Sequence, residues 1–68
     1  MDKDRVKSVL VKRLEHIKID KKLNRKDSFE LNKELYELID RTVTAYDQSF
    51  ITLQDMSLIV TCATMLIY

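Results

Sequence analysis

The chain has 68 residues, enough for one small domain, and its formal net charge is only +1. A domain of this size buries only about 60% of the surface that its unfolded chain exposes, so a disulfide, a metal or oligomerisation usually reinforces the core. The single cysteine excludes an internal disulfide, and the single histidine leaves no Cys/His spacing that would hold zinc. We therefore expect no metal and no cofactor, which leaves oligomerisation or efficient helix packing.

The chain contains no glycine and no proline. Hairpin-rich β folds need both residues in their turns, and glycine-rich phosphate loops need the first. The composition therefore predicts an all-α fold. We expect a single domain over residues 1–68, with helices at about 4–18, 28–46 and 53–67.

The first predicted helix, at about residues 4–18, is amphipathic. Five apolar side chains fall within an arc of about 140° when successive residues are placed 100° apart. These are Val6, Val9, Leu10, Leu14 and Ile17. The polar run from Asp20 to Lys26 shows no such period and predicts a loop.

The second predicted helix, at about 28–46, has a capping signal and a clear apolar stripe. Asp27 or Ser28 is expected as the N-cap, and Asp27 is followed three residues later by Glu30, which is the spacing of a capping box. The stripe consists of Leu31, Leu35, Leu38, Ile39, Thr42 and Tyr46. Acidic side chains occupy the opposite side.

The third predicted helix, at about 53–67, is apolar around most of its circumference. Thr52 and Asp55 repeat the capping spacing, and no charged residue occurs from Met56 onwards. The natural inner face consists of Leu53, Met56, Val60, Ala63 and Ile67.

A helix of this kind must be covered on more than one side, and two amphipathic neighbours cannot do so alone. The sequence therefore predicts a homodimer packed through the third helix. The interface residues that we expect are Leu58, Cys62, Met65 and Leu66. Apolar neighbours would make the thiol of Cys62 an inert small hydrophobe.

Charge is divided along the chain. Residues 1–26 carry ten Lys and Arg against four Asp and Glu, whereas residues 27–68 carry two against seven. The densest basic cluster consists of Lys18, Lys21, Lys22, Arg25 and Lys26. Such a cluster can contact nucleic-acid phosphates or an acidic partner, but it can equally be a solvated complement to the acidic side of the second helix. The second interpretation is favoured, because no aromatic side chain interleaves with the lysines to stack on bases.

Catalysis and membrane insertion have little support. His16 precedes Asp20 by four residues, but no nucleophile or second histidine accompanies the pair, so we expect no catalytic residues. The uncharged stretch of the third helix is shorter than the roughly 20 residues needed to span a bilayer. The charged N-terminus does not resemble a signal peptide, and a lone thiol suits a reducing compartment, so a cytoplasmic location is expected.

These features favour a small non-catalytic interaction or regulatory module that binds a protein partner, such as an inhibitor or antagonist. Its size and its Lys- and Ile-leaning composition are typical of a bacterial or phage protein. The alternative is a small nucleic-acid-binding regulator that uses the basic N-terminal half. A standard helix-turn-helix is disfavoured, because the third helix offers apolar side chains where a recognition helix needs polar ones.

Overall fold

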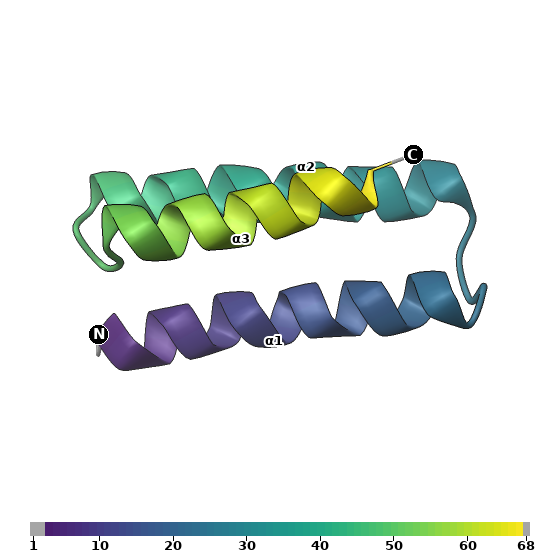
Figure 1. The fold of residues 1–68 in the computed structure, drawn as a ribbon, viewed down its shortest axis with the longest axis horizontal. Helices are drawn as coiled ribbons and strands as arrows, with labels where there is room; N and C mark the ends of the chain where they lie inside the picture. Colours follow the sequence, from purple (N-terminus) through teal and green to yellow (C-terminus); the bar gives the residue numbers. More distant parts are fainter. Residues whose placement is uncertain (1–2, 68) are drawn as a thin grey trace.

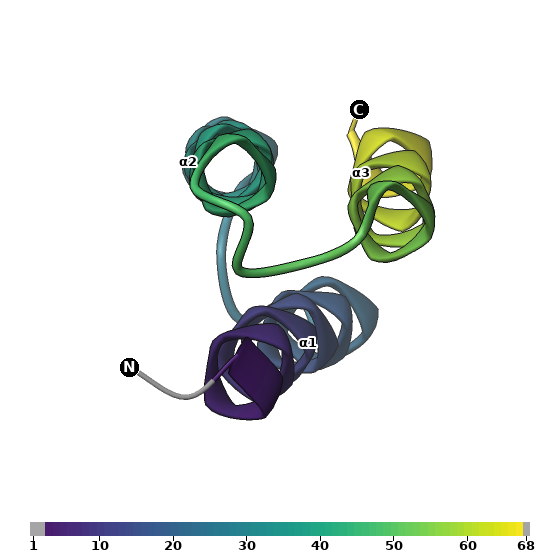
Figure 2. The ribbon, with the colours of Figure 1, turned by 90° about the vertical axis from the view of Figure 1, so that its left-hand side faces the viewer.

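The structure is a computed structural model that describes residues 3–67, and these residues form three α-helices with no strand. The helices are α1 (Lys3–Lys22), α2 (Ser28–Asp47) and α3 (Leu53–Leu66). Successive helices run antiparallel and lie side by side (Figure 1). Viewed along the bundle, they occupy the corners of a triangle (Figure 2). The predicted all-α, three-helix fold is confirmed.

Two side-chain caps fix where α2 and α3 begin. The Asp27 carboxylate accepts a hydrogen bond from the Glu30 amide at 2.8 Å, and the Thr52 hydroxyl oxygen accepts one from the Asp55 amide at 3.1 Å. Each bond satisfies one of the free amides in a first helical turn. Thr52 is confirmed as the N-cap of α3, and of the two candidates for α2 the structure selects Asp27 over Ser28.

The first two helices end in the same backbone motif, although the chain has no glycine. Asn24 and Ser49 adopt positive φ angles of 54° and 64° just beyond the helix ends. At the end of α2, the Ser49 amide bonds to the Tyr46 carbonyl and the Phe50 amide to the Ala45 carbonyl, each at 2.9 Å. This pair of bonds defines a Schellman motif, whose left-handed residue is usually glycine.

Helix α1 runs a full turn beyond its predicted end at residue 18, so the prediction of a loop was wrong for residues 20–22, whereas residues 23–26 do lie outside the helices. The last turn is stabilised by contacts with the following loop and with the end of α3, which local periodicity does not encode. Asp20 lies within 4 Å of Arg25 and Lys26, and the Lys21 ammonium donates to the Leu66 carbonyl at 2.7 Å. Helix α3 ends at Leu66, one residue before its predicted end.

The core lies along the axis of the triangle and receives side chains from all three helices. Its buried apolar members are Leu10, Leu14, Ile17, Leu31, Leu35, Leu38, Ala45, Ile51, Ile59 and Ala63. Thr42 is the only polar residue among those described as buried, with no exposed surface. Its hydroxyl donates to the Leu38 carbonyl at 2.7 Å, so no polar group is left unsatisfied there.

The inner face of α3 differs from the predicted one. Ala63 was expected inside and is buried, but Leu53 was expected inside and is 56% exposed, and Ile59, which was not expected inside, is buried. Met56 and Ile67 are only partly buried against the core. Because α3 is apolar on most sides, its periodicity does not determine which side faces the bundle. That choice is made by packing against α1 and α2.

Candidate interaction surfaces

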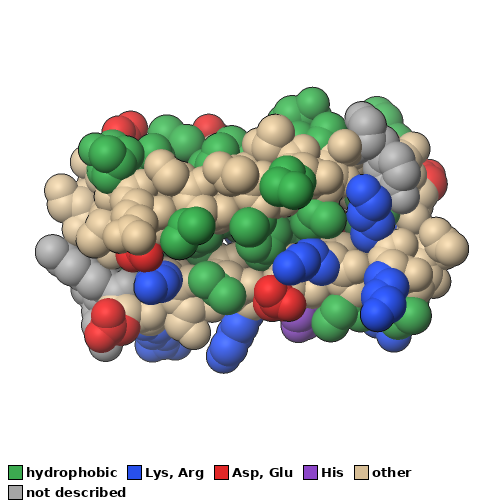
Figure 3. All heavy atoms as spheres, viewed as in Figure 1, with side chains coloured by type: hydrophobic (Ala, Val, Ile, Leu, Met, Phe, Trp, Pro, Cys, Tyr) green, Lys and Arg blue, Asp and Glu red, His purple; other side chains and the backbone are tan. Residues whose placement is uncertain are grey.

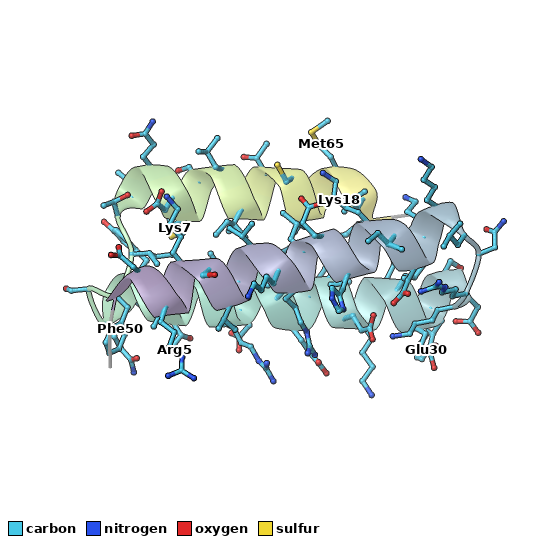
Figure 4. All side chains as sticks on the ribbon, turned by 90° about the horizontal axis from the view of Figure 1, so that it is seen from below. Arg5, Lys7, Lys18, Glu30, Phe50 and Met65 are labelled. Carbon is cyan, nitrogen blue, oxygen red and sulfur yellow. The ribbon has the colours of Figure 1, made fainter. Side chains whose placement is uncertain are left out.

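The exposed side of α3 carries an apolar surface without charge. Leu58 is 59% exposed, Met65 is 78% exposed, and Cys62 lies between them in the same exposed arc. The Met65 side chain projects away from the bundle (Figure 4). Hydrophobic and uncharged side chains cover α3, whereas Lys and Arg side chains follow α1 beneath it (Figure 3). We call Leu58, Cys62 and Met65 the α3 surface.

Two residues expected at the interface differ in their exposure. Leu66 is half-buried and packs against the core of its own chain, so only part of its side chain can contact a partner. Cys62 was expected in apolar surroundings, but its thiol is exposed. A step of one residue turns a helix by 100°, so Ala63 faces the core while Cys62 faces outwards.

The basic cluster is largely neutralised within the chain. Lys26 lies between the two helices that it connects, 3.4 Å from an Asp20 oxygen on α1 and 2.5 Å from a Glu34 oxygen on α2. The hydrogen bond to Glu34 is the main cause of a raised Lys26 pKa, and burial opposes it only in part. Lys26 thus bridges the acidic edge of α2 and the last turn of α1.

Three further cations of the cluster also have partners. Arg25 lies 3.7 Å from the Asp20 carboxylate, Lys18 lies 3.8 Å from Glu15, and Lys21 bonds to the end of α3. Surface ion pairs of this kind are weak individually. A phosphate would nevertheless have to displace several of them, so the geometry favours a solvated complement over a nucleic-acid site. Lys22 is the exposed member of the cluster for which no ion pair within 4.0 Å is found among the described residues.

A second surface, the groove between α1 and α2, was not foreseen. It consists of two adjoining hollows of about 460 and 510 Å³ that share Val6, Arg41 and Ala45. Their remaining lining comes from Arg5, Val9, Leu10, Asp40, Thr44, Gln48 and Phe50. Arg5 and Phe50 lie at the same end of the bundle, where α1 begins and α2 has just ended (Figure 4). We call this the α1–α2 groove.

A stripe of exposed apolar residues along α2 was also missed. Phe29, Tyr36 and Val43 recur every seven residues, and all three are exposed. Seven residues are nearly two helical turns, so the three side chains share one side of the helix. The seven-residue spacing is the feature of the sequence from which this stripe could have been predicted. Glu37 and Asp40 flank the stripe, so this surface is acidic as well as apolar.

An ion pair joins the beginnings of α1 and α3. The Lys7 ammonium lies 3.2 Å from an oxygen of Asp55, whose side chain is 21% exposed. The hydrogen bond from Lys7 is the main reason that the pKa of Asp55 falls below its ordinary value of 3.8, and the Thr52 hydroxyl adds to the effect. Asp55 therefore serves as part of the α3 first turn and as a tie to α1.

His16 and Asp20 line the same small hollow, but the Asp20 carboxylate is paired with Arg25 and Lys26. Within residues 3–67 no cluster of three or more His, Cys, Asp or Glu side chains could bind a metal ion. None of the helices described has the length and apolar character needed to cross a membrane.

Comparison of the chain with protein-family models, with curated proteins and with solved structures finds no match. The three surfaces on the three-helix bundle are therefore the basis for assigning a function.

Proposed function

We propose that this protein is a non-catalytic interaction module that self-associates through the α3 surface and binds a protein partner. The observation that carries the proposal is the uncharged character of the α3 surface. Leu58, Cys62 and Met65 are exposed on a helix that has no charged side chain after Asp55.

The absence of charge is what suits this surface to self-association. In a two-fold dimer each patch meets its own copy, so a charged patch opposes its own charge. The α2 stripe would bring Glu37 and Asp40 together in this way, whereas the α3 surface would bring apolar groups together. Burying one large apolar side chain contributes about 1.5–3 kcal/mol, and a symmetric contact counts each side chain twice.

The test is the mass of the protein in solution. Light scattering after size-exclusion chromatography should give twice the 8.1 kDa of one chain for the wild type. Leu58→Glu and Met65→Glu should each yield the single-chain mass, because a carboxylate buried in an apolar contact is costly. Phe29→Glu is the matched control: Phe29 is as exposed as Met65, at 80%, but lies on α2, so its substitution should leave the dimer intact.

A wild-type protein that keeps the single-chain mass in a concentrated sample would refute self-association. Equal loss of the dimer in the Phe29→Glu control would show that the contact does not depend specifically on α3.

A further inference from the structure

We propose that the α1–α2 groove binds an acidic amphipathic helix of a partner protein. The inference rests on the proposed function as an interaction module and names the chemistry of the partner. It concerns a different surface from the one that mediates self-association, so the two can be tested separately.

The floor of the groove is apolar. Val6 and Phe50 are half-buried, while Leu10 and Ala45 are buried beneath them. Val9 stands exposed at the margin on α1. Hollows of this size can receive one or two large apolar side chains from a ligand, and apolar anchors at spacings of three and four residues are how a helix occupies such a groove.

The margins are basic, and no ion pair with a described acidic group neutralises their charges. Arg5 and Arg41 line the groove from opposite helices, and Lys12 and Arg13 continue the basic margin along α1 beside Val9. All four are exposed, and none lies within 4.0 Å of an acidic group of residues 3–67.

Acidic residues near the groove do not cancel these cations. Asp40 lines one hollow, and Glu37 lies one turn from Arg41 on α2. Neither forms an ion pair with a described residue. The basic cluster differs in this respect, because Lys18, Lys21, Arg25 and Lys26 have partners in the chain. The cations of the groove form no ion pair with a described residue and can pair with carboxylates of a ligand.

Nucleic acid and a second copy are weaker fits. A phosphate backbone would use the arginines but leave the apolar floor unfilled, and no exposed aromatic ring lines the groove for base stacking. A symmetric contact between two copies would oppose arginine to arginine. A head-to-tail contact could place the acidic α2 stripe of one copy in the groove of the next, and such a contact would give rings or open oligomers of more than two copies.

The probe is a synthetic helical peptide of about 16 residues, roughly 24 Å long, with leucines along one side and glutamates on the others. A peptide with lysine in place of every glutamate is the charge control. We expect the glutamate peptide to bind at least tenfold more tightly and to shift the amide resonances of Val6, Val9 and Ala45. Affinity should fall as salt rises, because exposed charges are screened.

The double variant Arg5→Glu/Arg41→Glu should lose at least tenfold in affinity for the glutamate peptide and should prefer the lysine peptide. Lys22→Glu/Lys33→Glu makes the same change in net charge away from the groove and should stay within threefold of the wild type. All four side chains are exposed, so both variants should fold, as circular dichroism will show. Arg5→Gln/Arg41→Gln provides a milder version of the same test.

Several results would overturn the proposal. These are equal binding of the two peptides, binding of neither, or an equal loss in the Lys22/Lys33 control. Tighter binding of a single-stranded oligonucleotide than of the glutamate peptide would assign the groove to nucleic acid. Oligomers that grow with concentration and vanish in Arg5→Glu/Arg41→Glu would assign it to a second copy. A protein that stays monomeric yet binds the glutamate peptide would refute the α3 dimer and support the groove.

Discussion

At the scale of single residues, the chain places Asn24 and Ser49 at backbone positions that glycine usually occupies. Both adopt positive φ angles, in which a side chain crowds the backbone. Asparagine tolerates this conformation through local hydrogen bonding, but serine does so less well. The motif at the end of α2 therefore forms at some cost in conformational energy.

Ser49→Gly should raise the free energy of unfolding by about 1 kcal/mol, because glycine adopts positive φ without steric cost. Ser57→Gly is the control, since Ser57 lies within α3 and is exposed. There glycine should lower stability by about 0.5–1 kcal/mol. Urea unfolding of both variants measures whether the free energy of unfolding rises or falls in each. A loss of stability in Ser49→Gly would contradict the prediction.

Thr42 separates the contribution of a buried methyl group from that of a buried hydroxyl. Its hydroxyl bonds only within α2, to the Leu38 carbonyl, whereas its methyl group is part of the core. Thr42→Val should therefore change the free energy of unfolding by less than about 1 kcal/mol. Thr42→Ser keeps the hydrogen bond but removes the methyl group and should cost about 1 kcal/mol. The same unfolding measurement ranks the variants, and a reversed order would mean that the hydroxyl matters more than the packing.

At the scale of helices, capping and ion pairing determine how the elements are joined. The Asp55 amide donates to the Thr52 hydroxyl oxygen, and the Asp55 carboxylate pairs with Lys7, so the first turn of α3 is bound to α1. A carboxyl group whose folded-state pKa is lowered stabilises the fold above its unfolded-state pKa. That contribution disappears as the pH falls through the lower folded-state value.

The tie between α1 and α3 should therefore weaken in acid. The wild type should lose stability as the pH falls below about 4, and Asp55→Asn should show a smaller loss over the same range. Lys7→Gln should reduce the loss of stability in acid in the same way, since it removes the cation that lowers the pKa of Asp55. The double variant Asp55→Asn/Lys7→Gln should depend on pH as much as either single variant does. Thermal unfolding at a series of pH values measures all four proteins, and additive effects would show that the two residues act independently.

Much of the helical pattern could be predicted from the sequence, because its signals are local. Asp27 and Thr52 mark helix starts through bonds to residues only three positions away. The last turn of α1 could not be predicted from periodicity, because Asp20 is held by Arg25 and Lys26 in the following loop and Lys21 is held by Leu66, which is distant in the chain. The orientation of α3 was also hidden, since Leu53 and Ile59 are equally apolar and only packing decides which is buried.

The candidate surfaces were also predictable to different degrees, depending on whether their residues come from one helix or from two. Leu58 and Met65 were expected to be exposed, because they lie on one arc of a single helix. The α1–α2 groove requires Arg5 and Arg41 to come together from two helices, and nothing in the spacing along the chain indicates that. The stripe beginning at Phe29 had a visible seven-residue period but no capping or charge signal to draw attention to it.

At the scale of the whole molecule, the exposed thiol of Cys62 reports on self-association. In one chain the thiol is accessible, whereas the proposed contact through α3 would cover it. Modification by a thiol reagent should therefore be fast in dilute protein and slow as the concentration rises. Met65→Glu should react quickly at every concentration, and Cys62→Ser should not react. A rate that does not depend on wild-type concentration would contradict a contact at this position.

The hydrogen bond from the Lys21 ammonium to the Leu66 carbonyl links the C-terminal ends of α1 and α3. Helix α3 has no basic residue in its own last turn, so α1 supplies the positive charge that its carboxyl end favours. Helix ends ordinarily fray by local opening, independently of the rest of the protein. Here the last turn of α3 can open only if this bond also breaks, so its backbone amides should exchange hydrogen with solvent more slowly than those of a helix end without such a contact. Opening of one helix end thereby becomes coupled to the neighbouring helix.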